Sequence, residues 1–304
     1  MNAALELPEQ SGAYRWLYLD VTSGEDTAVA IFMLGSVFSP RYARGLSRGA
    51  SPMRHCAVNF ALYRGGVRRV WVLTEYPGAT LTGQHTLTIG GSRWRWRDDG
   101  SIEVEICDRA APFGPAVRAE IALSPGAAQH AAIALDPAAR HFWEPRAPRS
   151  HAQVRVPQLG VSFEGRAYHD GNHGTEPLGA RMPGWRWTRV HGPELTQVTY
   201  EPWGVDAIQV AASDRQLAVE RRRIAAAEGR RSGWGLSVPT QLAPWTQVAL
   251  PAPRLVESSP FYARLEAADA HHHALAEVAD FRRFHRPSVR WMAHFRERVA
   301  RASP

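Results

Sequence analysis

The chain has only two cysteines, Cys56 and Cys107, in 304 residues, and all 36 of its basic residues are arginine. Two cysteines are too few for a disulfide framework, so free thiols and a cytoplasmic location are expected. No apolar run approaches the roughly 20 residues that a membrane-spanning helix needs. The N-terminus also lacks the basic region followed by an apolar segment that marks a secretory signal peptide.

Motifs that bind a nucleotide or present a catalytic serine are missing as well. The sequence contains no GxGxxG before a helix, no phosphate-binding GxxxxGK[ST] and no GxSxG. The run His271-His272-His273 is better explained as a solvated loop than as a metal site, because adjacent residues on a strand point in opposite directions. His169 and His173 leave a metal near Asp170 as a weaker alternative. We therefore expect no cofactor and no resident metal.

The net charge of +7 indicates an anionic partner, either nucleic acid or a membrane surface. The arginines are scattered, and no recognition helix, zinc finger or single-strand-binding motif accompanies them. A peripheral contact with an anionic membrane is therefore favoured over binding to nucleic acid.

Short alternating apolar segments, separated by Gly, Asp and Pro turns, occupy most of the chain. This pattern predicts a mainly β protein built from antiparallel barrels or sandwiches. The Ala- and Pro-rich residues 124–150 suggest a boundary between an N-terminal β domain, residues 1–150, and a C-terminal β domain, residues 151–304. A basic helix is expected from Pro287 to about Arg301. It either packs on the barrel through Val289, Met292, Phe295 and Val299 or rests on lipid.

Tryptophan is abundant, with eleven in the chain. Trp94 and Trp96 are two residues apart, as are Trp185 and Trp187, so each pair shares one face of a strand. Such pairs either pack in an ordinary core or form an aromatic lining for a long apolar ligand or a developing cation.

The segment Phe163–Leu178, FEGRAYHDGNHGTEPL, concentrates polar groups within an otherwise alternating sequence. Tyr168 and Asp170 are two residues apart and point to the same side of a strand. A phenol beside a carboxylic acid can give or take a proton in a pocket. The plainer interpretation is a polar turn in which Asp170 caps backbone amides.

Several ordered blocks carry a resemblance to a known family. They include GSVFSP (35–40), HCAVNFALY (55–63), RHFWEP (140–145) and YHDGNHGTEPL (168–178). Across nearly its whole length the chain resembles the carotenoid 1,2-hydratases, also called hydroxyneurosporene synthases. The resemblance implies two lipocalin-like β domains and cofactor-free addition of water to the terminal C1–C2 double bond of acyclic carotenes such as neurosporene or lycopene.

The resemblance also implies a catalytic set, namely His141 and Trp143 in HFW with Tyr168 and Asp170 in YHD. Asp170 would protonate C2, and Trp143 and Tyr168 would face the tertiary cation at C1. His141 would place or deprotonate the attacking water, or tune Asp170. The residues expected to bind the substrate are Asn59, Asn172, Trp185 and Trp187.

The site is expected where the two domains meet, in a protein that docks on the inner or photosynthetic membrane to collect its substrate. Two other functions remain open from the sequence. One is a lipocalin-like carrier that binds a carotenoid or lipid without chemistry. The other is a cyclase that acts on a polyene or polyketide on the same scaffold.

Overall fold

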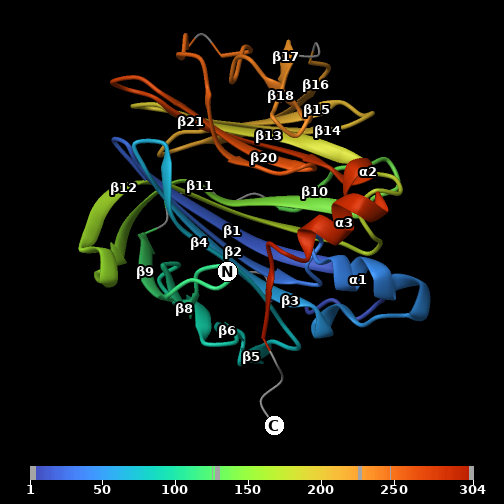
Figure 1. Ribbon diagram of the computed structural model, residues 1–304. Helices are drawn as coiled ribbons and strands as arrows, with labels where there is room; N and C mark the ends of the chain where they lie inside the picture. The colour runs from blue at the N-terminus through green and yellow to red at the C-terminus, as the bar shows by residue number, and fades with distance from the viewer. Residues whose placement is uncertain (1–4, 125, 127–130, 225–227, 247, 301–304) are drawn as a thin grey trace.

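The computed structural model describes residues 5–124, 126, 131–224, 228–246 and 248–300. Two layers of antiparallel strands face each other, and short helices lie at one side where the layers meet (Figure 1). These helices are α1 (Pro40–Gly45), α2 (Phe281–Phe284) and α3 (Pro287–Ala293).

The larger sheet has thirteen strands within the described residues, and its main path runs β22-β4-β3-β2-β1-β12-β11-β9-β8-β7-β6-β5. Strand β10 pairs with β11 beside this path. The strands are β1 (Tyr14–Ser23), β2 (Asp26–Leu34), β3 (Cys56–Arg64), β4 (Val67–Tyr76), β5 (Thr80–Thr82), β6 (Thr86–Ile89), β7 (Ser92–Trp96), β8 (Ile102–Arg109), β9 (Ala116–Ser124), β10 (Ile133–Ala134), β11 (His141–Val156), β12 (Val161–Gly174) and β22 (Arg298–Val299).

The second sheet has seven strands in the order β16-β15-β14-β13-β21-β20-β19, and β17 and β18 form a separate pair. Its strands are β13 (Gly184–His191), β14 (Thr196–Pro202), β15 (Ala207–Ala212), β16 (Leu217–Arg222), β19 (Arg254–Ser258), β20 (Tyr262–Ala268) and β21 (His273–Asp280), and the separate pair is β17 (Gly229–Arg231) with β18 (Ser237–Pro239). The mainly β fold matches the prediction from sequence, although neither sheet closes into a barrel in the described part of the chain.

Alternation along β1 divides the larger sheet into two faces. Leu17 and Leu19 pack with Trp94 and Trp96 in a core enclosed by the larger sheet. Trp16 and Tyr18 point the other way and belong to the core between the two sheets. The pair Trp94 and Trp96 is therefore ordinary core packing, whereas the opposite face of β1 contributes to the region between the layers.

Buried polar links join the layers. Asp20 on β1 forms a fully buried ion pair with Arg189 on β13. The hydroxyl of Thr27 on β2 donates to Oε1 of Glu266 on β20 at 2.5 Å. Buried polar groups of this kind are tolerated because each has a partner, and they define how one sheet sits on the other.

The division between the sheets does not coincide with the domain boundary expected at residue 150. Strand β11 runs through that position, and β11 and β12 both pair within the larger sheet. The change of sheet comes between β12 and β13, after Gly174, and the chain returns to the larger sheet at β22. Residues 125 and 127–130 of the expected boundary region lie outside the described residues.

The expected long C-terminal helix is wrong beyond Ala293, where α3 ends. Arg298 and Val299 instead form β22, which pairs in parallel with β4. Val289 packs in the core, but Phe295 lies past the helix and is exposed. Arg301 lies outside the described residues. Within the described ranges every helix is too short or too polar to cross a membrane.

Strands β19, β20 and β21 were not expected from the sequence. Nearly every residue of β20 and β21 is buried, so these strands lack the polar-apolar alternation that marks a half-exposed strand. The histidine run is also only partly a solvated loop. His273 begins β21, is buried, and its Nε2 lies 2.8 Å from Oε1 of Glu266.

Candidate active site

The predicted catalytic residues come from adjacent strands of the larger sheet. Strand β12 lies between β1 and β11, and Asp170 pairs in register with Tyr18 and Pro145. Asn172 is likewise opposite Trp16 and Trp143. Because residues two apart share a face, Asp170 and Asn172 both point toward the second sheet.

Asp170 is bound by two of the other predicted catalytic residues. The indole Nε1 of Trp143 donates to Oδ2 of Asp170 at 2.7 Å, and the hydroxyl of Tyr168 donates to the same oxygen at 2.6 Å. All three side chains are buried. Since Oδ2 accepts both bonds, the proton of a neutral Asp170 belongs on Oδ1.

Burial raises the pKa of Asp170 to about 7. The hydrogen bonds from Tyr168 and Trp143 favour the carboxylate and oppose this rise, and the charges of Glu277 and Asp20 add to it. A carboxyl group with this pKa keeps a large fraction of its protons at neutral pH. Asp170 is therefore equipped to act as a general acid.

His141 lies apart from this group. Its Nδ1 is 2.9 Å from the hydroxyl of Tyr14, and its Nε2 is 3.6 Å from Oε1 of Glu176. Burial lowers the pKa of His141, which favours the neutral ring. Tyr14 stacks on both His141 and Trp16, with ring centroids 5.8 and 5.1 Å apart. His141 thus reaches the site through Tyr14 and Trp16, without a hydrogen bond to Asp170 among the described residues.

A cavity of about 90 Å³ lies between the two sheets, with Asp170 in its wall. The four residues expected to bind the substrate all line it, namely Asn59, Asn172, Trp185 and Trp187. Other rings complete an aromatic wall, provided by Trp16, Tyr18, Phe38, Trp71, Tyr200, Phe261 and Tyr262.

The aromatic side chains around Asp170 brace one another. Trp187 lies edge-on to Tyr18 at 5.3 Å between ring centroids and also contacts Tyr168 at 5.2 Å. Trp185 stacks on Trp16 at 5.8 Å. Trp143 and Tyr168 stand behind Asp170 and are not part of the cavity lining, so their direct partner is the carboxyl group.

The two asparagines are held by neighbours. Nδ2 of Asn59 donates to the carbonyl oxygen of Val72 at 2.6 Å, and Nδ2 of Asn172 donates to the hydroxyl of Tyr200 at 3.3 Å. These bonds fix the amides in the wall of the cavity. Their carbonyl oxygens are the groups that can still accept a bond from a ligand or water.

Sequence reasoning missed the charged part of the lining. Glu257, Arg264 and Glu277 line the cavity from β19, β20 and β21, the strands that were not expected from the sequence. Trp16 and Tyr18 could have been found, because both lie on one face of a strand that the sequence does predict. Among the described residues no group of three or more His, Cys, Asp or Glu side chains is arranged to hold a metal ion.

Comparison with known families identifies the chain. The family model described as carotenoid hydratase CrtC matches residues 30–303. The chain belongs to the carotenoid hydratase family. Its fold class agrees with a solved structure from Nitrosomonas europaea that carries the name AttH. That structure has a TM-score of 0.61 at 12% identity and covers 92% of this chain and 98% of its own.

Three curated relatives of this carotenoid hydratase family member are named acyclic carotenoid 1,2-hydratase. The protein of Thiocapsa roseopersicina is 38% identical over 62% of this chain and 47% of its own length. That of Rubrivivax gelatinosus is 32% identical over 84% and 65%, and that of Cereibacter sphaeroides is 31% identical over 77% and 83%. The chain thus spans about half to two thirds of the first two relatives.

Proposed function

We propose that this protein is an acyclic carotenoid 1,2-hydratase, which adds water across the terminal C1–C2 double bond of a carotene such as neurosporene or lycopene. The observation that carries the proposal is Asp170, a buried carboxyl group with a pKa of about 7 in the wall of an aromatic cavity. An acid that is neutral when an apolar substrate arrives can protonate an alkene. Membership of the carotenoid hydratase family supports the choice of alkene.

Proton transfer is the first step. The proton on Oδ1 of Asp170 moves to C2, the π electrons form the new C–H bond, and C1 becomes a tertiary cation. The carboxylate that remains keeps its hydrogen bonds from Trp143 and Tyr168. Because these donors are already in place, they stabilise the negative charge as it develops.

The cation forms beside aromatic faces. Trp16, Tyr18 and Trp187 line the cavity next to Asp170, and a desolvated aromatic ring stabilises a cation by about 2 kcal/mol. Water then attacks C1 and gives a tertiary alcohol after loss of one proton. The sum of the two steps is the addition of one water molecule.

Product analysis tests this function. The purified protein is incubated with lycopene or neurosporene in detergent, and the products are separated and weighed by mass spectrometry. The hydratase proposal predicts a 1-hydroxy product that has gained one water. Recovery of unchanged, bound carotene would support a carrier instead, and a ring-closed isomer of unchanged mass would support a cyclase.

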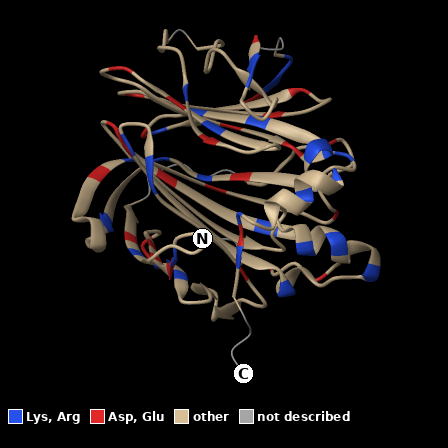
Figure 2. Cartoon of the chain, in the orientation of Figure 1, with Lys and Arg blue, Asp and Glu red and all other residues tan. Residues whose placement is uncertain are grey.

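We further propose that the protein is cytoplasmic and docks on an anionic membrane through its helical side. Trp291 and Phe295 are 62% and 61% exposed, and their rings pack edge-on at 4.8 Å. Figure 2 shows basic residues gathered on the helices at this side, and exposed arginines there include Arg44, Arg282 and Arg286. Exposed aromatic rings with surrounding cations suit the surface of an anionic bilayer.

The docking face is continuous with the cavity. Ala293 and Arg296 belong to the same segment as Trp291 and Phe295, and both line the cavity. A carotene that leaves the bilayer at this face would therefore enter the cavity that Asp170 lines.

Vesicle flotation tests the docking proposal. Binding should require anionic lipid and weaken as salt screens the arginines. Replacement of Trp291 and Phe295 by serine should reduce it further, whereas replacement of the exposed Leu159, in the turn between β11 and β12, should not. Flotation that ignores both salt and the Trp291/Phe295 change would contradict this docking face.

A further inference from the structure

One wall of the cavity carries charges that a hydrocarbon substrate cannot use. Glu257, Arg264 and Glu277 lie side by side on β19, β20 and β21, in register, and all three line the cavity. Arg264 is fully buried, and Glu257 and Glu277 are 7% and 8% exposed. Buried charges are costly even when they are paired, so their place beside an apolar substrate calls for a polar ligand.

Hydrogen bonds within this charged wall leave one oxygen of Glu277, a residue that lines the cavity, without a bond from the arginine. Nε and Nη2 of Arg264 both donate to Oε1 of Glu277, at 3.0 and 2.8 Å. Its Nη1 donates to Oε2 of Glu257 at 3.2 Å. Arg264 therefore anchors Glu277 through Oε1 and makes no bond to Oε2. The hydroxyl of Tyr262 is a second neighbour that favours the ionised form of Glu277.

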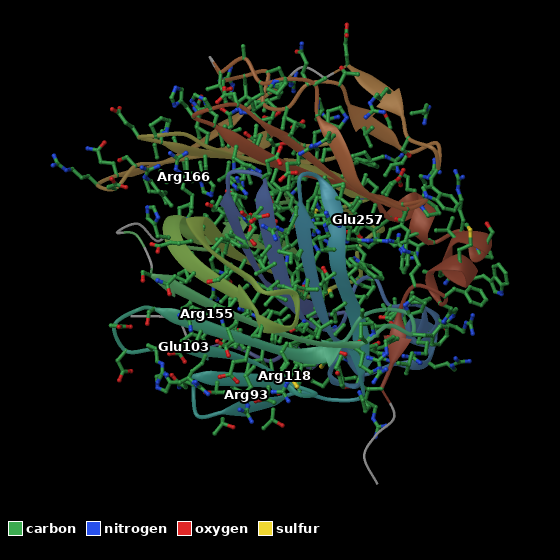
Figure 3. All side chains as sticks on the ribbon, turned by 60° about the vertical axis from the view of Figure 1, so that its left-hand side comes forward. Arg93, Glu103, Arg118, Arg155, Arg166 and Glu257 are labelled. Atoms are coloured by element: carbon green, nitrogen blue, oxygen red, sulfur yellow. The ribbon has the colours of Figure 1, made fainter. Side chains whose placement is uncertain are left out.

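Glu257 is more fully engaged than Glu277. Its Oε2 also accepts a bond from the hydroxyl of Tyr63 at 2.9 Å, and its Oε1 lies 3.7 Å from Nη2 of Arg296. Figure 3 labels Glu257 where the two layers meet. Glu257 has three polar neighbours and holds Arg264 in place. Glu277 has two, Arg264 and Tyr262, and is the freer carboxyl group.

Glu277 faces the cavity from the sheet opposite Asp170. Tyr18 is the register partner of Asp170, Trp187 is the register partner of Glu277, and the two rings are 5.3 Å apart. Burial raises the pKa of Asp170, and the negative charge of Glu277 raises it further. An acid and a second carboxyl group thus share one cavity from two sides.

We propose that the wall of Glu257, Arg264 and Glu277 is the subsite for the attacking water, and that Glu277 takes the proton which this water loses. The inference rests on the proposed hydration of an alkene. Glu277 takes the role of base in place of His141, because His141 lies outside the lining of the cavity. Water hydrogen-bonds to charged groups far better than to the aromatic wall, so it occupies this side when the carotene fills the rest.

These two carboxyl groups account for both proton transfers of the reaction. Asp170 loses its proton to C2, the oxygen of the water forms a bond to C1, and one O–H bond of the water breaks as Oε2 of Glu277 takes the proton. Glu277 is then neutral and Asp170 is ionised, so a proton returns from Glu277 to Asp170 through solvent before the next cycle. Burial raises the pKa of Glu277, although Arg264 and the hydroxyl of Tyr262 oppose the rise. The raised pKa makes the carboxylate a stronger base.

Glu277→Gln, assayed in heavy water, separates this role from proton donation. The amide keeps an acceptor for Arg264 but cannot act as a base. Formation of the alcohol should fall about a hundredfold or more, which is the usual contribution of a general base. Asp170 should still deliver a deuteron to C2, and the cation should revert by returning a proton from C2 to Asp170. Recovered carotene would therefore contain deuterium at C2, whereas Asp170→Asn would give neither deuterium nor alcohol.

Glu266→Gln is the matched control. Glu266 is a buried glutamate on β20, bonded to Thr27 and His273, and it is not part of the cavity lining. This variant should form the alcohol at close to the wild-type rate. Thermal melts of each variant establish that it is folded. If Glu277→Gln does not fold, Glu277→Asp keeps the charge beside Arg264 and withdraws the carboxyl group, and it should shift the ratio of deuterium exchange to alcohol in the same direction.

The role of Glu277 is overturned if Glu277→Gln hydrates at the wild-type rate, or if the folded variant loses deuterium exchange together with hydration. A wild-type ratio in Glu277→Asp overturns it equally. A wild-type protein that makes no alcohol from acyclic carotenes would overturn the proposed function itself. The two failures are therefore distinguishable in one set of assays.

Discussion

The indole nitrogen of Trp143 lies 2.7 Å from Oδ2 of Asp170 and joins two neighbouring strands at a single buried carboxyl group. This bond favours the ionised form, and burial favours the neutral form. The balance places the pKa of Asp170 at about 7. The same group can therefore release a proton to a substrate and regain it from solvent, which repeated turnover requires.

Hydration should decline as the pH rises through about 7. The ordinary pKa of an aspartate is 3.8, and the folded protein raises it, so Asp170 holds its proton until the pH approaches the raised value. Above that pH the carboxylate has no proton to give. The measurement is kcat/KM against pH. A rate that stays constant from pH 6 to pH 9 would contradict Asp170 as the acid.

Trp143→Phe should move this decline to higher pH. The phenyl ring fills most of the indole space but cannot donate to Oδ2, so the carboxylate loses one of its two stabilising bonds. A hydrogen bond to a charged group contributes about 1.5–3 kcal/mol, which corresponds to a displacement of about one pH unit or more. The rate at neutral pH should also fall, because the developing carboxylate is less stabilised. An unchanged midpoint would show that the indole bond does not tune Asp170.

Asp170→Asn should stabilise the fold at alkaline pH. Below pH 3.8 Asp170 is neutral whether the chain is folded or not, so its raised pKa has no cost there. As the pH rises from 3.8 to about 7, the folded state keeps a proton that the unfolded chain releases, so the free energy of unfolding falls. The full difference is about 4 kcal/mol of unfolding free energy at most. Urea unfolding at pH 5 and pH 8.5 measures it, and a variant that is less stable at both values would contradict the account.

Glu297→Gln, at another residue that lines the cavity, should likewise stabilise the fold more at high pH than at low pH. Burial, together with the charge of Glu75, raises the pKa of Glu297 well above its usual range. The stability that depends on a protonated Glu297 is present at low pH and is lost as the pH rises. Thermal melts should therefore show a larger gain for the variant at pH 8 than at pH 5. An equal gain at both values would mean that Glu297 is not a titrating group in the fold.

The sequence predicted much of one wall of the site and little of the other. Tyr168 and Asp170 are two residues apart on one strand, so their shared face could be derived from this spacing. The first part of β11 falls within the Ala- and Pro-rich residues 124–150, which suggest a domain boundary, because prolines such as Pro145 and Pro148 are disfavoured in a strand interior. Its pairing with β12 is irregular between Pro145 and Ser150, which is how the strand accommodates these prolines.

The charged wall could not be derived in the same way. Arg264 and Glu277 lie on strands that are buried on both faces, so neither the period of apolar residues nor their polarity marks them as lining a cavity. Their role depends on pairing across three strands and on contact between two sheets. These are long-range relationships that local sequence patterns do not contain.

The most direct test of the central claim compares the wild-type protein with Asp170→Asn on lycopene or neurosporene in heavy water. The account predicts that the wild type forms a 1-hydroxy product with one deuterium at C2. It predicts that folded Asp170→Asn forms no such product and leaves the carotene without deuterium. An Asp170→Asn variant that hydrates the carotene at the wild-type rate would contradict the claim that this buried carboxyl group is the acid.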